Sequence, residues 1–306
     1  MTGPFRLGCR GSPLALAQAA LVRDALVAAH GLAAEDVAIV PIRTTGDEVQ
    51  DRPLAEIGGK ALWTKEIDRA LAEGKIDFAV HSMKDVETIR PAAIVIAATL
   101  PRGDVRDRLI GAESIEALPE GAWIGTSSPR RAAQLLYLRR DLRIETLRGN
   151  VATRLAAVEA GKIDATLLAA AGLDRLGHDE IGAAIALETL LPAPQQGAIG
   201  IETLGARGDL RDLLAAIDDA ATHRCIAAER ALLETLGADC HSPVAALARI
   251  EGGVMTIAAQ LLSNDGVEAV SGKREAAVDD GEAGAMALAG ELLGQAGAAL
   301  RGLFAG

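Results

Sequence analysis

The stretch that decides the fold is I-D-F-A-V-H-S-M-K-D-V, residues 76–86. Its first half is a short apolar run, which is typical of a buried strand, and its second half carries His81, Ser82, Lys84 and Asp85. In open α/β sheets, polar side chains that follow such a strand face the crevice where ligands bind. Taken alone, the stretch leaves two interpretations open, a solvated strand tip and a binding site.

Strand and helix patterns alternate on both sides of this stretch. Residues 5–8 and 37–42 are expected to form strands, and 13–30 a helix with Ser12 as its N-cap and Pro13 as its first residue. Alternation of this kind predicts α/β domains with parallel sheets covered by helices on both faces. The same order returns further along the chain, with strands expected at 123–125, 144–147, 163–170 and 198–202.

The C-terminal region follows a different pattern. Strands are expected over 244–250, 254–262 and 267–273, joined by Gly-containing turns and followed by an Ala-rich helix over 282–303. We therefore predict a small α+β domain with a three-stranded antiparallel sheet. Residues 43–63 show no clean period, and a loop of this length inside a compact domain is interpreted as a lid.

Composition and charge exclude several classes of protein. The net charge of -11 argues against a general nucleic-acid or membrane-surface binder. Half of the residues are hydrophobic but only 2% are aromatic, so aliphatic side chains must fill the cores. The cysteines, Cys9, Cys225 and Cys240, form no C-x-x-C pair, which fits a reducing compartment. The sequence begins without a hydrophobic signal core and has no long apolar span, so we expect a cytoplasmic protein.

Three predicted strand-to-helix turns carry arginine next to a hydroxyl or amide side chain. Helix N-termini offer free N–H groups and the positive end of the helix dipole, and arginine adds a fork that fits carboxylate or phosphate. One such turn is typical of an ordinary capped helix, but three of them with arginine indicate a polyanionic ligand. The residues are Arg10 with Ser12, Arg130 and Arg131 with Ser127 and Ser128, and Arg148 and Arg154 with Asn150.

Cys240 lies in A-D-C-H-S-P, in a loop just after an expected helix end. Two interpretations stay open from the residues alone, a buried packing residue and a catalytic pair with His241. Zinc is disfavoured because no second pair of ligands lies at a useful spacing. Cys9, on the first strand, and Cys225, on a helix, are interpreted as packing residues.

Segments along nearly the whole chain together resemble the porphobilinogen deaminase family, also called hydroxymethylbilane synthase. Their order and spacing agree with that family from C-R-G-S-P-L-A at residues 9–15 to the small final domain. The segments are A-V-H-S-M-K-D-V (79–86), I-G-T-S-S-P-R-R (124–131), L-R-G-N-V-A-T-R-L (147–155), A-A-G-L-D-R-L-G (170–177), P-A-P-Q-Q-G-A-I-G-I-E (192–202) and G-A-D-C-H-S-P-V (237–244).

The resemblance implies a transferase that joins four porphobilinogen units head to tail, releases ammonia each time, and starts from a dipyrromethane cofactor held by a thioether to Cys240. Asp85 matches the catalytic aspartate, whose carboxylate stabilises the azafulvenium cation left by ammonia loss. His81 is interpreted as structural support. Positions that match cofactor- or substrate-binding residues are Arg10, Ser12, Lys84, Thr126, Ser127, Ser128, Arg130, Arg131, Arg148, Gly149, Asn150, Arg154, Arg175 and Gln196, and the lid includes Lys60 and Trp63.

The resemblance also implies the architecture. We expect two doubly wound domains similar to periplasmic binding proteins, followed by the small α+β domain. Domain 1 is expected at 1–99 and 195–216, domain 2 at 103–191, and domain 3, with the attachment cysteine, at 219–306. We further expect a monomer without metal, nucleic-acid or membrane partners.

Some positions depart from the family pattern. Glu56 stands where a basic lid contact is usual, which puts that contact in doubt, whereas Pro129 is benign in a first helical turn. Two alternatives stay open: an anion-binding or sensing module on the same fold, and an inactive homologue. The lack of an export signal and the motifs of Asp85 and Cys240 count against the first. The other departures are Trp63, Asp174 and the pairs 194–195 and 238–239.

Overall fold

The structure, a computed structural model, describes residues 4–44, 64–239 and 241–304 of the 306-residue chain. The chain divides into two compact units. The first consists of residues 1–102 with 198–223, and the second of residues 103–197 with 224–306. Each unit thus combines stretches that are distant in sequence. The expected division into three domains stays a prediction.

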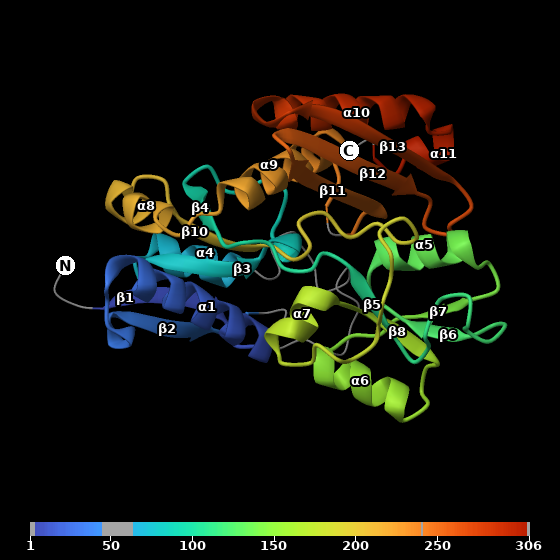
Figure 1. The fold of residues 1–306 in the computed structure, drawn as a ribbon, viewed down its shortest axis with the longest axis horizontal. Coiled ribbons are helices and arrows are strands. Elements are labelled where there is room, and N and C mark those ends of the chain that lie inside the picture. Colours follow the sequence, from blue (N-terminus) through green and yellow to red (C-terminus); the bar gives the residue numbers. More distant parts are fainter. Residues whose placement is uncertain (1–3, 45–63, 240, 305–306) are drawn as a thin grey trace. The chain divides into compact units, whose positions relative to one another are not determined.

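The first unit is built on a five-stranded sheet of order β2-β1-β3-β10-β4 (Figure 1). Strands β1, β2 and β3 run parallel, whereas β10 is antiparallel to both β3 and β4. The sheet is therefore mixed, where the alternating pattern predicts a parallel one, because β10 comes from the segment that returns to this unit. The strands are β1 (Phe5–Arg10), β2 (Val37–Ile42), β3 (Phe78–Ser82), β4 (Ile94–Thr99) and β10 (Ile199–Leu204).

Helices cover both faces of this sheet. Successive residues of a strand point to opposite faces, so Phe78 and Val80 pack with α1 and α8, whereas Ala79 packs with α4. The helix α1 begins and ends as the sequence predicts, since Ser12 Oγ accepts from Ala15 N and Gly31 closes the helix in the left-handed conformation. The helices are α1 (Pro13–His30), α4 (Lys65–Ala72), α8 (Gly208–Ala215), η1 (Ala34–Asp36) and η2 (Met83–Asp85).

The second unit contains another mixed five-stranded sheet, of order β7-β6-β8-β5-β9. Strand β6 is parallel to β7 and β8, and β5 is antiparallel to β8 and β9. Helices α5, α6 and α7 follow β6, β7 and β8 in turn. Their bounds are β5 (Asp107–Ile110), β6 (Trp123–Gly125), β7 (Arg143–Glu145), β8 (Ala165–Ala169), β9 (Ala183–Ala184), α5 (Pro129–Leu138), α6 (Val151–Glu159) and α7 (Ala170–Arg175).

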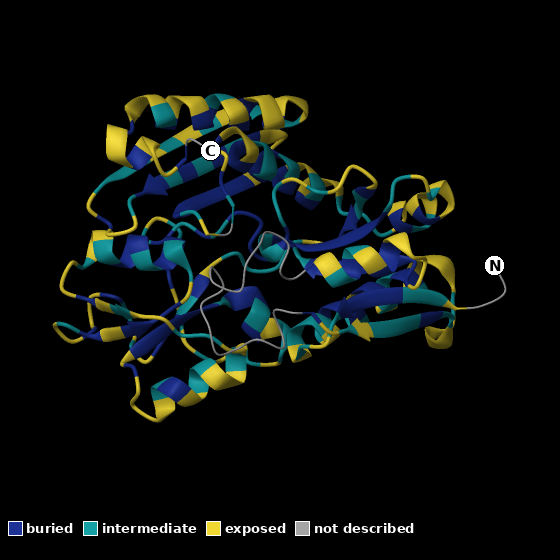
Figure 2. Cartoon of the chain, turned by 180° about the vertical axis from the view of Figure 1, so that it is seen from behind, coloured by how far each residue is buried: buried dark blue, intermediate teal, exposed yellow. Residues whose placement is uncertain are grey.

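The second unit also holds the predicted three-stranded antiparallel sheet, of order β11-β12-β13. One helix was expected after it, but the chain leaves the helical conformation at Ala296, where Gly297 N donates to Glu268 Oε1 at 2.6 Å. Helix α10 turns a stripe of buried residues to the sheet and an exposed face outward (Figure 2). The elements are α9 (Ala220–Thr235), β11 (Val244–Glu251), β12 (Val254–Leu262), β13 (Ala269–Ala277), η3 (Val278–Asp280), α10 (Gly281–Gln295) and α11 (Ala298–Arg301).

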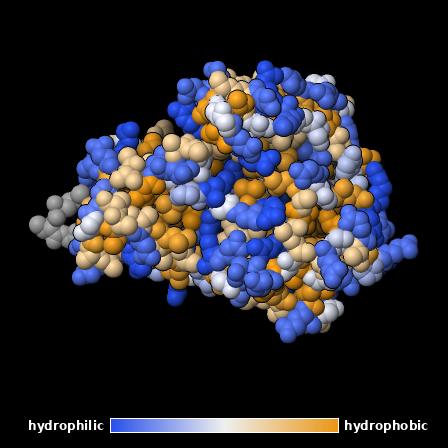
Figure 3. Space-filling view, viewed as in Figure 1, coloured by the Kyte–Doolittle hydropathy of each residue, from blue (hydrophilic) through white to orange (hydrophobic). Residues whose placement is uncertain are grey.

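Aliphatic side chains fill the cores, as the composition predicts. Among the buried hydrophobic residues of the described ranges, only Phe78 and Phe304 are aromatic. Hydrophilic residues lie between small hydrophobic groups over the face seen in Figure 3. Within residues 4–44, 64–239 and 241–304, no helix has both the length and the hydropathy needed to cross a bilayer. The predicted α/β class with a small α+β region is confirmed.

Candidate functional site

The first unit gathers polar residues at one edge of its sheet. Strands β1 and β3 are parallel, so their carboxyl ends, at Arg10 and Ser82, lie at the same edge. The turn η2, which carries Lys84 and Asp85, follows β3 directly. The structure therefore places Arg10, Ser12 and Asp85 around one pocket. The described residues that line it are Arg10, Ser12, Leu14, Ala15, Gln18, Thr64, Val80, His81, Ser82, Asp85 and Val86.

Packing and hydrogen bonds of Ser82 and Met83 hold the turn that bears Asp85. Met83 is fully buried, and its backbone N donates to Ala198 O at 3.1 Å. The neighbouring Ser82 hydroxyl exchanges hydrogen bonds with the buried Gln18 amide, at 2.8 Å and 3.1 Å. These contacts fix the backbone directly before Lys84 and so restrict where the Asp85 carboxylate can lie.

A buried ionic network lies next to the pocket. Glu202 is 0% exposed and accepts two hydrogen bonds, both of 2.8 Å, from the guanidinium of Arg90. His81 Nε2 is 3.3 Å from Glu202 Oε2. Burial by itself raises the pKa of Glu202, but His81 and Arg90 outweigh it and lower that pKa to about 2. Arg90 also pairs with Asp68 at 2.6 Å and with Glu87 at 2.7 Å.

Sequence reasoning gave no part to Arg90 or Glu202. Glu202 does carry a signal, because it ends the apolar run A-I-G-I-E, where a carboxylate needs a partner once it is buried. The partner itself could not be read from the sequence, since Arg90 is 112 residues away. The supporting role expected of His81 stays a prediction; His81 lines the pocket, and its Nε2 lies 3.3 Å from the buried Glu202 carboxylate.

In the second unit, the carboxyl ends of β6 and β7 each lead into a capped helix. Ser128 Oγ accepts from Arg131 N at 3.4 Å at the start of α5, and Thr126 Oγ1 accepts from Ser128 N at 3.1 Å. Asn150 Oδ1 accepts from Thr153 N at 3.0 Å at the start of α6. The caps predicted at Ser128 and Asn150 are confirmed.

The turn before α6 brings together three of the expected binding residues. Arg154 donates from Nε to Gly149 O at 3.0 Å and from Nη2 to Ser127 Oγ at 3.3 Å. Gly149 has φ of +114°, a conformation that side chains rarely adopt. Arg148, directly before it, is half-buried. Hydroxyl and guanidinium donors from two different turns thus converge at this edge.

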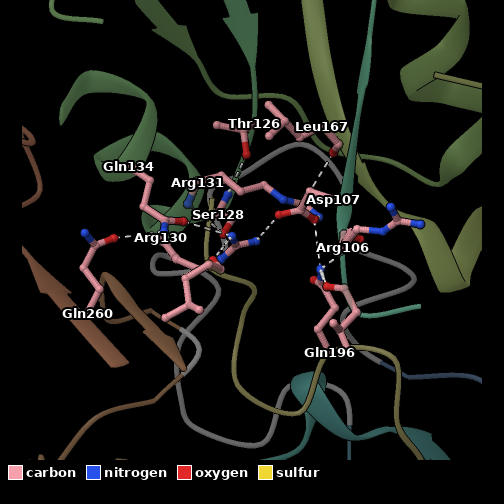
Figure 4. Close-up of polar contacts among 12 residues, drawn as sticks. Arg106, Asp107, Thr126, Ser128, Arg130, Arg131, Gln134, Leu167, Gln196 and Gln260 are labelled. Atoms are coloured by element: carbon pink, nitrogen blue, oxygen red, sulfur yellow. Dashed lines mark hydrogen bonds and ion pairs between the residues drawn. The ribbon is translucent and has the colours of Figure 1, made fainter. Parts of the chain in front are cut away.

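A buried polar cluster of the second unit surrounds Asp107, at the start of β5 (Figure 4). Asp107 Oδ2 accepts from Arg130 Nη2, and Asp107 Oδ1 accepts from Arg131 Nη2, both at 2.7 Å. Gln196 Nε2 donates to the same Oδ1 at 3.0 Å. We refer to Asp107, Arg130, Arg131, Gln134 and Gln196 as the Asp107 cluster. The structure therefore buries two arginines that the sequence placed at a helix start.

Other contacts hold the guanidinium groups of this cluster in place. Arg130 Nη1 donates to Gln134 Oε1 at 3.0 Å and to Leu191 O at 2.9 Å. Arg131 Nη1 donates to Leu167 O at 2.9 Å. The Nε atoms of both arginines are buried and have no hydrogen-bond partner within the part of the chain that the structure describes.

The electrostatics of the cluster favour an added anion. Burial raises the pKa of Asp107, but Arg130 and Arg131 outweigh this effect and hold that pKa well below its ordinary value. Burial also lowers the pKa of Arg130, against the opposing effect of Asp107. Two guanidinium groups against one carboxylate leave one positive charge in excess in the cluster, and a buried excess charge is costly until it is paired.

Arg175, at the end of α7, is another positively charged side chain whose surroundings favour a bound anion. Its Nη2 donates to Gly197 O at 2.6 Å, and burial lowers its pKa to about 10. A carbonyl oxygen offsets the charge less well than a carboxylate does. Asp174, its neighbour and a departure from the family pattern, pairs instead with Arg108 at 2.8 Å.

The Pro194–Gln195 departure falls in a strained and buried turn. Gln195 has φ of +64°, the only positive value among the non-glycine residues described. Its backbone N donates to the Glu229 carboxylate, and its Oε1 accepts from Arg230 Nη1 at 3.0 Å. These bonds offset the strain and hold the adjacent Gln196 within reach of Asp107.

Some predicted residues lie outside the described ranges. They are the attachment cysteine, Cys240, the lid residues Lys60 and Trp63, and Glu56. On either side of Cys240, His241 N donates to Asp239 Oδ1 at 2.8 Å, and Asp239 N donates to Ser242 Oγ at 3.1 Å.

Comparison with known proteins gives consistent matches over the chain. The profile of a family described as "Porphobilinogen deaminase, dipyromethane cofactor binding domain" matches residues 5–212, and one described as "Porphobilinogen deaminase, C-terminal domain" matches residues 223–294. A Sphingopyxis alaskensis protein named porphobilinogen deaminase is 56% identical, over 99% of this chain and 97% of its own length. One of the same name from Paracoccus denitrificans is 48% identical, over 96% and 95%.

Solved structures with lower identity are also similar. The VFT2 domain of Bordetella pertussis BvgS is 16% identical, and the alignment covers 74% of this chain and 91% of that one with a TM-score of 0.37. A zinc-bound ligand-binding component of an ABC-type import system from Staphylococcus aureus is 12% identical, over 76% and 73%, with a TM-score of 0.40.

Proposed function

The chain belongs to the porphobilinogen deaminase family, and from this premise we propose that it condenses four porphobilinogen molecules head to tail, with release of ammonia, to give hydroxymethylbilane. The reaction makes the protein a transferase of tetrapyrrole biosynthesis. Each porphobilinogen carries two carboxylates, so a growing chain accumulates negative charge. The observation that best supports this proposal is the uncompensated positive charge of the Asp107 cluster, together with Arg175.

Asp85 is the proposed catalytic residue. It lines the pocket with Arg10 and Ser12, on a turn whose backbone is fixed by Met83. Its carboxylate stabilises the cation left on the substrate by ammonia loss and accepts protons from the pyrrole nitrogen. A charge pair at about 4 Å with an effective dielectric near 20 is worth roughly 4 kcal/mol. If that interaction forms only in the transition state, it approaches about 10³-fold in rate.

The described residues fit a dipyrromethane cofactor that carries carboxylates. The excess positive charge of the Asp107 cluster, together with Arg175, favours an anion of this kind. When bound, the cofactor supplies the terminal pyrrole to which the first substrate unit is joined. We assign its attachment to Cys240. The remaining members of the predicted set, among them Ser127, Asn150 and Arg154, are proposed to hold carboxylates at the exposed edge of the second unit.

Intact-mass measurement tests the assignment of cofactor and enzyme together. The purified chain is expected to carry the added mass of two pyrrole units and to convert porphobilinogen to bilane with release of ammonia. Cys240→Ser is expected to lose both the added mass and turnover, whereas the control Cys225→Ala, at a buried cysteine, keeps both. An unmodified wild-type chain that makes no bilane would refute the proposal. It would leave the anion-binding module on the same fold as the better account.

The cellular location and oligomeric state follow less directly. We propose a cytoplasmic monomer, and the buried thiol of Cys9, which forms no disulfide among the described residues, fits a reducing compartment. Burial raises the pKa of Cys9 to about 11, which keeps that thiol protonated and unreactive at neutral pH.

A further inference from the structure

Asp107 has no part in the site predicted from the sequence, yet it contacts two of that site's arginines. We propose that Asp107 is a positioning residue: it holds Arg130 and Arg131 so that their Nε–H edges together bind one carboxylate of the pyrrole ligand. This inference rests on the proposed function and deepens it, because it names the donor atoms and the residue that sets them.

Arg130 and Arg131 each keep one N–H donor that no described residue uses. An arginine side chain has five N–H donors in a rigid fork. In both Arg130 and Arg131 the Nη ends are occupied by Asp107 and by backbone or amide oxygens. Both Nε–H groups are buried and without a partner among the described residues. A buried donor left unpaired is destabilising, so the Nε edges are where an anion gains most.

One carboxylate fixes the positions of both guanidinium groups. Asp107 receives one Nη2 from each arginine on separate oxygens, so a single carboxylate sets the separation of the two guanidinium groups (Figure 4). Asp107 is itself held by Gln196, which also donates to Val105 O at 2.8 Å. Rotation of either arginine would therefore break contacts with a carboxylate that cannot follow it.

Hydrogen bonds also link the Asp107 cluster to the three-stranded sheet. Gln134 accepts from Arg130 and donates from Nε2 to Gln260 Oε1 at 3.0 Å, on β12 of the three-stranded sheet. Gln260 in turn donates to Ser271 Oγ at 3.0 Å, on β13. The fork is thus braced by both sheets of the second unit, which is more support than a solvated cation needs.

Removal of the negative charge of Asp107 distinguishes a positioning role of this residue from a purely electrostatic one. Asp107 cancels one of the two positive charges, so Asp107→Asn makes the cluster more positive. If Asp107 acted only through charge, that substitution would strengthen anion binding. If Asp107 positions the fork, the same substitution weakens binding despite the added positive charge. If Asp107 has only a structural role, Asp107→Asn would lower the thermal stability and leave anion binding unchanged.

The test compares Asp107→Asn with Asp77→Asn in the full chain. Asp77 is a matched buried carboxylate that clamps Arg6 through its backbone N and its guanidinium, at 2.8–3.0 Å, at the opposite end of β3. For chains that carry the two-pyrrole mass, Asp107→Asn is expected to raise the KM for porphobilinogen about 10-fold to 100-fold, with a much smaller change in kcat. A change of this size corresponds to the loss of one charge-assisted hydrogen bond. Asp77→Asn is expected to leave the KM unchanged.

A second readout does not depend on turnover. Porphobilinogen is expected to raise the midpoint of thermal unfolding of the wild-type chain, and Asp107→Asn to lose most of that rise. An equal or larger rise in the variant, or a KM equal to that of Asp77→Asn, overturns the proposal. If Asp107→Asn does not fold, Asp107→Glu keeps the buried charge and displaces the carboxylate, and an unchanged KM there overturns it equally. A wild-type chain that binds porphobilinogen but makes no bilane would instead contradict the proposed function.

Discussion

Gly200 lies against Met83 with no room for a side chain between them. A Cβ on Gly200 would lie 2.0 Å from Met83 Sδ and 2.8 Å from its Cγ. Gly200 pairs with His81 across the β3–β10 ladder, and Met83 begins the turn that carries Lys84 and Asp85. This glycine of the sheet therefore limits how closely the turn that bears Asp85 can approach β10.

Gly200→Ala is expected to lower kcat about 10-fold or more, because Met83 must shift and displacements of about 1 Å at a catalytic group can cost as much as 10²-fold in rate. Circular dichroism should show an intact fold. The matched control is Gly208→Ala at the start of α8, where an added Cβ meets no atom within 4 Å. A kcat equal to that of the control would show that the turn does not depend on this contact.

The lowered pKa of Glu202 predicts that the protein loses part of its folding stability at low pH. Its folded-state pKa, about 2, lies below its ordinary value of 4.5, so its contribution to stability is complete above pH 4.5 and is lost as the pH falls toward 2. The size of that contribution is on the order of 3 kcal/mol. Glu202→Gln is expected to be less stable than wild type at pH 7, since Arg90 and His81 lose their shared partner.

The measurement is denaturant unfolding of both chains from pH 7 down to about pH 2. The stability difference between wild type and Glu202→Gln should be largest at neutral pH and shrink between pH 4.5 and 2. A difference that stays constant across this window would mean that folding does not lower the pKa of Glu202.

Gly149→Ala is expected to destabilise the chain by more than its backbone conformation alone explains. Its φ of +114° is unfavourable for alanine, and the added Cβ would lie 2.7 Å from Thr153 Cγ2. Gly177→Ala is the control, because it has φ of +73° and no atom within 4 Å of the added Cβ. In thermal unfolding, we expect Gly149→Ala to lose about 1–3 kcal/mol more stability than Gly177→Ala, which is a typical cost of overpacking. Equal losses in the two variants would remove the steric part of this account.

Local signals predicted the elements best. Ser12 and Pro13 start α1 where the sequence placed it, and Asn150 caps α6. These features depend on residues adjacent in sequence, so they can be read without knowledge of the fold. The start of β5 could not be read in this way. Asp107 lies in the polar run D-V-R-D-R, which is typical of an exposed loop, and its burial depends on partners from α5 and from residue 196.

The sequence could predict where the candidate residues lie relative to their strands and helices, but it could not predict the contacts that these residues make. The motif around residues 124–131 placed Arg130 and Arg131 near a helix start, but their burial against Asp107 depends on how β5 joins the sheet. Likewise, the sequence placed Asp85 after a buried strand, whereas the network of Glu202 and Arg90 behind it joins residues distant in sequence. Long-range pairing of buried charges has no local sequence signal.

The most direct test of the central claim is the rate at which Asp85→Asn converts porphobilinogen to bilane, compared with wild type. Both rates are normalised to the fraction of chains that carry the two-pyrrole mass, and thermal unfolding confirms that the variant is folded. Because Asn keeps the shape of the side chain and removes its charge, a loss of about 10³-fold is expected. A folded Asp85→Asn chain that turns over porphobilinogen at close to the wild-type rate would contradict the account.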